Sequence, residues 1–158
     1  MTKEKIIIMA KKVVLGFSGG LDTSYCVKYL TEEKGYEVHS IIVNTGGFDK
    51  EELKQIEEHA YKLGVKTHKT VDAVQNYYDS IIKYLIFGNV LKNNTCPLSV
   101  SAERLSQALH IAEHTKELNA DAVAHGSTGA GNDQVRFDMV FHIMIPGIEI
   151  ITPIRDLQ

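Results

Sequence analysis

Short apolar runs alternate with helix-forming stretches along most of this 158-residue chain. Five of the runs have the length and composition of buried strands, at residues 13–17, 38–43, 65–71, 122–125 and 148–152. A strand–helix–strand repeat is typical of right-handed crossovers, which form a parallel sheet covered by helices on both faces. The pattern therefore predicts an α/β protein: a three-layer α/β/α domain with a five-stranded parallel sheet.

Apolar side chains recur at helical spacing between these runs. The spacing predicts helices over residues 21–34 and 101–118, and two more between the second and fourth strands. Gly64 is expected to end the first of these two, and Asp72 could cap the second, which runs to Leu85.

Three segments depart from the simple repeat. Residues 86–99 are rich in glycine, asparagine and proline and predict a long loop, of a kind that is often functional. Residues 135–145 alternate as a strand would, yet they also fit one face of a helix that Asn132 could cap. After residue 152 we expect no closing helix, which suggests a piece of a longer protein.

Composition limits the kinds of protein and partner. With 44% apolar and 23% charged residues the chain can bury a core, which excludes a disordered chain, a collagen and a coiled coil. The 17 basic and 20 acidic residues form no basic run, so no nucleic-acid partner is expected. Lys11 and Lys12 interrupt the first apolar run, so no membrane partner is expected either. Cys26 and Cys96 form no CxxC pair, and we expect a reduced, cytoplasmic protein.

The sharpest motif is SGGLDTS at residues 18–24, between the first strand and the first helix. Two glycines let the backbone approach an anion closely, and the N–H groups and hydroxyls at a helix start can hold phosphate. Asp22 would need a cation beside phosphate, which suggests Mg²⁺ between its carboxylate and pyrophosphate oxygens. The alternative is a turn with a structural role only, which joins strand and helix and carries a Ser or Asp cap. GxxxxGK[ST] and GxGxxG are absent, and the motif resembles the PP-loop of the N-type ATP pyrophosphatases.

A second constellation, HGSTGAGNDQVRFD at residues 125–138, also follows a strand. It can therefore face the first motif across the crevice where open α/β sheets bind ligands. Its residue types suit zwitterionic substrates, with Asp133 for an ammonium group and Arg136 for a carboxylate. A surface loop rich in Asn, Asp and Gly is the alternative.

Together the two motifs resemble those of the argininosuccinate synthase family. Residues 97–104, PLSVSAER, also resemble the family's citrulline loop. The resemblance covers residues 11–156 and only the family's N-terminal nucleotide-binding domain. It implies a Rossmann-like sheet of the adenine nucleotide alpha hydrolase type, with strand order 3-2-1-4-5. Residues 1–10 would be an N-terminal extension and residues 11–158 the ATP-binding PP-loop domain. The family's synthetase domain and the C-terminal helix of its homotetramer have no counterpart in this sequence.

The resemblance also implies roles for individual residues. ATP-binding positions would be Gly16, Phe17, Ser18, Gly19, Gly20, Leu21, Asp22, Thr23, Ser24, Val43, Ala124, His125 and Gly126. Aspartate-binding positions would be Thr128, Asn132 and Asp133, and citrulline-binding positions would be Cys96, Ser101, Asn132 and Arg136. Asp22 and Asp133 would be the catalytic pair, with Mg²⁺ at Asp22. Cys96 stands where the family usually has tyrosine, which removes a hydroxyl from the citrulline loop.

The implied reaction joins citrulline and aspartate while ATP is cleaved to AMP and pyrophosphate through a citrullyl-adenylate. We expect this chain alone to bind ATP without being fully active. Two alternatives remain: a stand-alone nucleotide-binding or sensing module, and another adenylating PP-loop ligase. A tRNA-thiolating enzyme with Cys96 as sulfur carrier is disfavoured, because the second motif does not belong to that group.

Overall fold

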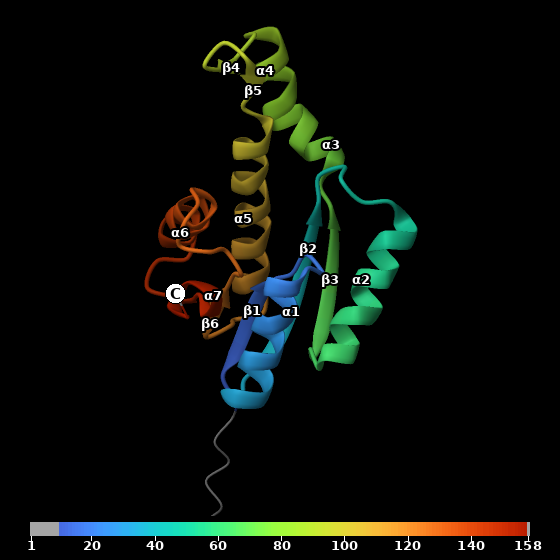
Figure 1. The fold of residues 1–158 in the computed structure, drawn as a ribbon, viewed down its shortest axis with the longest axis vertical. Helices are drawn as coiled ribbons and strands as arrows, with labels where there is room; N and C mark the ends of the chain where they lie inside the picture. The colour runs from blue at the N-terminus through green and yellow to red at the C-terminus, as the bar shows by residue number, and fades with distance from the viewer. Residues whose placement is uncertain (1–9, 158) are drawn as a thin grey trace, which may run out of the picture.

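The computed structural model describes residues 10–157, and the expected extension therefore lies almost wholly outside the described residues. Its main sheet contains β1 (Lys12–Gly16), β2 (Glu37–Asn44), β3 (Thr67–Asp72), β6 (Ala122–Ala124) and β7 (Glu149–Ile151). All four pairings are parallel and the order is β3-β2-β1-β6-β7 (Figure 1). The predicted five parallel strands and their order are confirmed, since β6 and β7 are the fourth and fifth predicted strands.

Helices cover both faces of the sheet and bury two separate cores (Figure 1). α1 (Leu21–Lys28) and α2 (Lys50–Leu63) pack on one face, against Val13 and Leu15. α5 (Ser99–Glu117) and α6 (Asp133–Met144) pack on the other, against Val14. Because successive side chains of a strand point to opposite faces, the apolar run of β1 serves both cores.

Local signals explain where the first helices begin and end. α1 continues as the π-helical segment η1 (Tyr29–Glu33), and Gly35 follows at φ +66°, which matches the predicted 21–34 helix. α2 begins with a capping box, in which Asp49 and Glu52 each bond the other's backbone N–H. It ends at Gly64 in the left-handed conformation, as expected.

A small lobe projects beyond the carboxyl end of β3 (Figure 1). It contains α3 (Val74–Tyr77), the π-helical η2 (Tyr78–Ile82), α4 (Lys83–Phe87), β4 (Leu91–Lys92) and β5 (Cys96–Pro97). The predicted loop at 86–99 is therefore wrong in part, because β4 and β5 pair there as an antiparallel hairpin. Asn93 and Asn94 adopt positive φ at the hairpin turn, a conformation that asparagine tolerates better than most residues. Asp72 ends β3 and accepts a hydrogen bond from the Val74 N–H at 3.2 Å.

The ambiguous segment 135–145 is helical and forms most of α6. Phe137 and Phe141 are buried on its inner face, whereas Met139 and Ile143 remain 47% and 70% exposed. Burial of one helical face outweighed the alternating pattern. Asn132 occupies the N-cap position but makes no side-chain capping bond.

The end of the described chain differs from expectation. A short helix, α7 (Pro153–Asp156), follows β7 directly, so the expectation of no closing helix is wrong. Pro153 stands in its first turn, where a missing N–H costs nothing. Ile154 packs against the core formed by α1 and α2. Within residues 10–157, none of the helices has the length and apolar character needed to cross a membrane.

Candidate functional site

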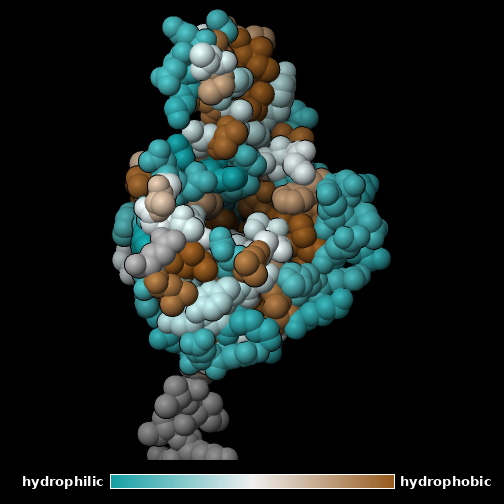
Figure 2. All heavy atoms as spheres, viewed as in Figure 1, coloured by the Kyte–Doolittle hydropathy of each residue, from teal (hydrophilic) through white to brown (hydrophobic). Residues whose placement is uncertain are grey.

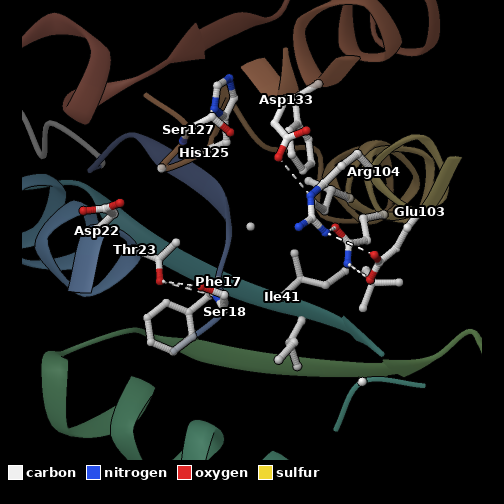
Figure 3. A pocket seen from close by; sticks show the side chains of 18 of the residues that line it. Phe17, Ser18, Asp22, Thr23, Ile41, Glu103, Arg104, His125, Ser127 and Asp133 are labelled. Carbon is white, nitrogen blue, oxygen red and sulfur yellow. Dashed lines mark hydrogen bonds and ion pairs between the residues drawn. The ribbon is translucent and has the colours of Figure 1, made fainter. Parts of the chain in front are cut away.

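A cavity of about 550 Å³ opens at the carboxyl ends of β1, β2 and β6. The strand order reverses here, because one crossover runs from β1 to β2 and another from β3 to β6 on the other side of β1. Ligands of open α/β sheets bind at such points. Figure 2 shows a hollow near the middle of the visible face of the molecule, with apolar residues inside it. Figure 3 shows Ser18 and Thr23 on one side of the cavity and Asp133 and Arg104 across from them.

The first glycine-rich turn is built mainly from bonds among its own residues. Gly19 has φ +77°, a conformation that favours glycine, and a Cβ there would lie 3.0 Å from Ile56 Cγ1, so the Ile56 side chain would have to shift. Ser18 Oγ accepts from the Gly20 N–H at 3.4 Å and lies 3.3 Å from Thr23 Oγ1. Thr23 in turn donates to the Gly20 carbonyl at 3.2 Å.

Ser24 faces away from the cavity. Its hydroxyl donates to the Gly20 carbonyl at 2.8 Å and lies 2.9 Å from His59 Nε2 on α2. Because the hydroxyl proton is used on Gly20, His59 donates to Ser24 from Nε2. Ser24 therefore supports the turn and does not line the cavity.

The second glycine-rich turn touches the first. A Cβ on Gly126 would lie 3.1 Å from Thr23 Cγ2 and 3.4 Å from Thr23 N. The two turns can therefore lie this close together because residue 126 is glycine. Both Ser18 and Thr128 line the cavity. Residues of both motifs therefore line one crevice, as predicted, although Asn132 and Arg136 of the second motif lie outside its lining.

An ionic cluster forms the wall opposite the first turn. Asp133 Oδ1 lies 2.8 Å from Arg136 Nη1, and Asp133 Oδ2 lies 3.2 Å from Arg104 Nε. Arg136 also donates to Ser101 Oγ at 3.0 Å. Asp133 and Arg136 were predicted to bind opposite ends of a zwitterion, but here they neutralise each other. A zwitterion would have to replace the contacts of this cluster with its own.

Three residues of α5 complete this wall and were missed by the sequence analysis: Glu103, Arg104 and Gln107. Glu103 accepts from Thr45 Oγ1 at 2.7 Å and from Gln107 Nε2 at 3.2 Å, which links α5 to the loop after β2. A sequence signal existed, since Glu103 and Arg104 end the predicted citrulline loop at 97–104 and Gln107 shares their helical face.

The structure brings only part of the predicted site to the cavity. Lining it are Gly16, Phe17, Ser18, Asp22, Thr23, Val43, His125, Gly126, Thr128 and Asp133. Outside the lining are Gly19, Gly20, Leu21, Ser24, Cys96, Ser101, Ala124, Asn132 and Arg136. Cys96 lies exposed in the hairpin of the projecting lobe, whereas the other cysteine, Cys26, lies in the core, where burial raises its pKa to about 12.

A parallel Rossmann-like sheet with a glycine-rich turn after β1 and a cavity at its strand ends defines a class of α/β domains. Two solved structures share this fold. One is a predicted subunit of tRNA methyltransferase from Methanocaldococcus jannaschii, with TM-score 0.60, 20% identity, and coverage of 94% of this chain and 70% of that one. The other is NMN synthetase from Francisella tularensis, with TM-score 0.58, 15% identity, and coverage of 76% and 47%.

The sequence identifies the family within this class. Residues 12–158 match the profile described as the arginosuccinate synthase N-terminal HUP domain. Argininosuccinate synthase from Methanocaldococcus jannaschii is 44% identical over 150 residues, which are 95% of this chain and 38% of that protein. The enzyme of Xylella fastidiosa is 43% identical over 94% of this chain and 36% of its own length. The chain belongs to the argininosuccinate synthase family and spans somewhat more than a third of these relatives.

Proposed function

We propose that this chain binds ATP in the cavity and forms the nucleotide-binding part of an argininosuccinate synthase. The observation that carries the proposal is the contact between the two glycine-rich turns, at Gly126 and Thr23, beside one cavity at the strand ends. Two glycine-rich turns that meet in this way bring backbone N–H groups and hydroxyls together beside the cavity, which is the arrangement that phosphate-binding turns use.

The cavity has separate surfaces for the two ends of a nucleotide. Apolar side chains from Ile41, Val43 and Phe48 line one part, which suits the flat adenine ring. Ser18 and Thr23 line the part next to the first turn, which suits the phosphates. This division supports ATP over a ligand that is charged throughout.

Asp22 is the carboxylate nearest to the proposed phosphate end. Among residues 10–157 there is no group of three His, Cys, Asp or Glu side chains that could hold a metal by themselves. One carboxylate still suits Mg²⁺, which is commonly bound by one or two carboxylates together with substrate phosphates. We propose that Asp22 holds Mg²⁺ in this way, where the ion would neutralise charge on the phosphates.

The ionic wall fits the two amino acids of the family reaction. We propose that Thr128, Asn132 and Asp133 receive aspartate. For citrulline we propose Cys96, Ser101, Asn132 and Arg136. The ureido oxygen of citrulline would attack the α-phosphorus of ATP, and pyrophosphate would leave. The aspartate amine would then displace AMP from the citrullyl-adenylate. The chain's own contribution would be to position the reactants and to balance charge.

Turnover by this chain alone should be low. All four residues proposed for citrulline lie outside the cavity lining: Cys96, Ser101, Asn132 and Arg136. Well-oriented reactants can contribute on the order of 7–11 kcal/mol to lowering a barrier, and a poorly held citrulline forfeits much of that. A pyrophosphate-release assay with ATP, citrulline and aspartate is expected to show little turnover beside a full-length family enzyme.

Calorimetric titration of the chain with ATP, with and without Mg²⁺, tests the proposed function. Asp22→Ala should remove most of the gain that Mg²⁺ gives, about tenfold in affinity, and leave the metal-free affinity unchanged or higher. Asp79→Ala is the matched control, because it deletes an exposed carboxylate in the projecting lobe. Equal Mg²⁺-dependent affinity in the wild type and Asp22→Ala would remove Asp22 from the proposal, and no ATP binding by the wild type would refute it.

The incomplete citrulline set also favours a second candidate, a module that binds ATP or AMP without ligation. The two candidates differ in their response to amino acids. In the ligase, citrulline and aspartate should trigger release of pyrophosphate at a slow but measurable rate. In the module, ATP would bind and no acceptor would release pyrophosphate. A different acceptor that triggers release would instead indicate another adenylating ligase.

A further inference from the structure

The second glycine-rich turn is held from behind by side chains that lie outside the cavity. We propose that Asp138 and Arg155 are positioning residues, which fix this turn against the first one by controlling the hydrogen bonds of His125. The inference rests on the proposed nucleotide site, and it assigns the buried side of that site to α6 and α7.

His125 is a buried support and not an exposed ligand. It follows β6 directly, its residue is 2% exposed, and its backbone N–H donates to the Ile151 carbonyl at 3.2 Å. Its ring stacks on Phe137, with centroids 5.4 Å apart and planes 21° from parallel. In Figure 3 the ring is directed away from the middle of the cavity. The residue that the family resemblance assigned to ATP therefore acts through its neighbours.

Both ring nitrogens of His125 are engaged, and the geometry fixes which one carries the proton. The Ser127 backbone N–H points at Nδ1 with a separation of 3.3 Å, and Nε2 lies 2.9 Å from Asp138 Oδ1. A backbone N–H can only donate, so Nδ1 is the acceptor and Nε2 donates to the carboxylate. The neutral Nε2–H tautomer is the one that holds Ser127 in place.

Arg155 supports the second turn through two hydrogen-bonded partners. Its Nη1 lies 2.7 Å from Asp138 Oδ2, which orients the carboxylate that faces His125. The same nitrogen lies 3.2 Å from Gln134 Oε1, and Gln134 Nε2 donates to the Gly129 carbonyl at 2.6 Å. One guanidinium on α7 therefore supports both the start and the middle of the turn.

These contacts reach the proposed phosphate end through Gly126. Neither Asp138 nor Arg155 lines the cavity, whereas Gly126 and Ser127 do. Gly126 leaves no room for a Cβ without crowding Thr23, so a shift of the second turn moves the wall next to the first. Loss of either positioning residue should therefore weaken nucleotide binding without removing any group that touches the nucleotide.

Burial favours the neutral ring of His125. Burial lowers the pKa of His125, although the hydrogen bond and charge of Asp138 act in the opposite direction. Arg155 lowers it further and Asp156 raises it, and both of these belong to α7. An imidazolium would carry a proton on Nδ1 as well, facing the Ser127 N–H. Protonation would therefore break the bond that holds the turn.

Asp138→Asn provides the decisive test. The asparagine oxygen is expected to face Arg155, so its NH₂ group faces His125 Nε2 and forces the proton onto Nδ1. Nitrogen-15 spectroscopy of the imidazole should then show the Nδ1–H tautomer, a change that mere loosening of the fold would not produce. ATP affinity should fall on the order of tenfold. Asp138→Glu keeps a carboxylate and should restore the Nε2–H tautomer and most of the affinity.

A second histidine–carboxylate–cation group supplies the matched control. Glu117 Oε2 lies 3.1 Å from His114 Nδ1 and 2.6 Å from Lys69 Nζ, and none of these three residues lines the cavity. Glu117→Gln should leave both the His125 tautomer and ATP affinity unchanged. Should Asp138→Asn fail to fold, Arg155→Gln takes its place, with an expected affinity loss of about threefold and faster hydrogen exchange at Ser127.

Two outcomes would overturn the inference: an unchanged tautomer in Asp138→Asn, or a changed tautomer with wild-type ATP affinity. Failure of the proposed function looks different. If the wild type bound no ATP, the function would fall while the tautomer and the exchange rate at Ser127 still reported whether Asp138 and Arg155 hold the turn.

Discussion

The two glycine-rich turns lie side by side and follow neighbouring strands, yet they are stabilised in different ways. In the turn after β1, Ser18, Gly20 and Thr23 bond one another, and all lie within six residues of sequence. In the turn after β6, the supporting groups are Asp138 and Arg155, from α6 and α7. One wall of the cavity is therefore stabilised by bonds between residues close in sequence, and the other by side chains from distant helices.

This difference determines how each wall should respond to change. A local turn is sensitive to the backbone conformation of its own residues and tolerant of changes elsewhere. A turn that is held by side chains from other helices is sensitive to distant substitutions and to the protonation of buried groups. Substitutions in the two walls should therefore differ in how strongly they affect ATP binding and stability.

Gly19→Ala should have the largest effect, because a Cβ at φ +77° is strained and would also lie 3.0 Å from Ile56 Cγ1. The left-handed conformation alone costs about 1–2 kcal/mol for a residue with a Cβ. We expect ATP affinity to fall by roughly 30-fold in calorimetric titration. Gly35→Ala is the control, since Gly35 has φ +66° and nothing within 4 Å of an added Cβ. It should lose stability but keep ATP affinity.

Acid should destabilise the fold through its buried histidines. Burial lowers the pKa of His68, His114 and His125 in the folded chain. As pH falls through about 6.5, the unfolded chain takes up protons that the folded chain does not, so the free energy of unfolding decreases. Each such histidine contributes up to about 1.4 kcal/mol per pH unit. Urea unfolding between pH 7.5 and 5.5 measures this slope.

Replacement of one histidine separates the contributions to that slope. His114→Gln should reduce the slope by up to one proton and leave ATP affinity at neutral pH unchanged, because His114 lies outside the cavity lining. A slope of zero in the wild type, or one of opposite sign, would contradict the assignment of buried neutral rings.

Gly126→Ala should have an intermediate effect on binding. The added Cβ would lie 3.1 Å from Thr23 Cγ2, so the two turns must separate by a few tenths of an ångström. We expect a loss of ATP affinity of about fivefold, on the order of 1 kcal/mol. Thr23→Ser removes the methyl group and keeps the hydroxyl, so the double variant should regain most of the affinity lost. If the two substitutions were simply additive, the turns would not meet as described.

Ser24→Ala should have the smallest effect on binding. It removes the hydroxyl that links Gly20 to His59, but it leaves the cavity lining intact. We expect a loss of stability of about 1 kcal/mol and a change in ATP affinity of about twofold. Ser80→Ala, which removes a hydroxyl bonded to the Asn76 carbonyl in the projecting lobe, is the matched control. A large loss of affinity in Ser24→Ala alone would show that the first turn is less self-sufficient than its bonds suggest.

The sheet and the first turn could be predicted from the amino-acid sequence alone. Each strand is a short apolar run between helical stretches, and the crossover rule leaves few ways to arrange them. The first turn could be predicted because its bonds join residues close together in sequence, and Gly19 marks its left-handed step. The sequence also placed the second turn at the same edge of the sheet, since parallel strands share their carboxyl ends.

The pairing of the remaining polar groups depends on how the helices pack, which the sequence pattern does not show. An alternating pattern and a helical face coexist in residues 135–145, and burial of Phe137 and Phe141 selected the helix. Asp133 was expected to face a substrate, yet its carboxylate accepts a hydrogen bond from Arg104, which stands 29 positions earlier in the sequence. His125 was expected to contact nucleotide, yet Asp138 and Arg155 engage it from behind. Charged side chains are long and pair with whichever partners packing brings within reach, so no periodicity in the sequence records those pairs.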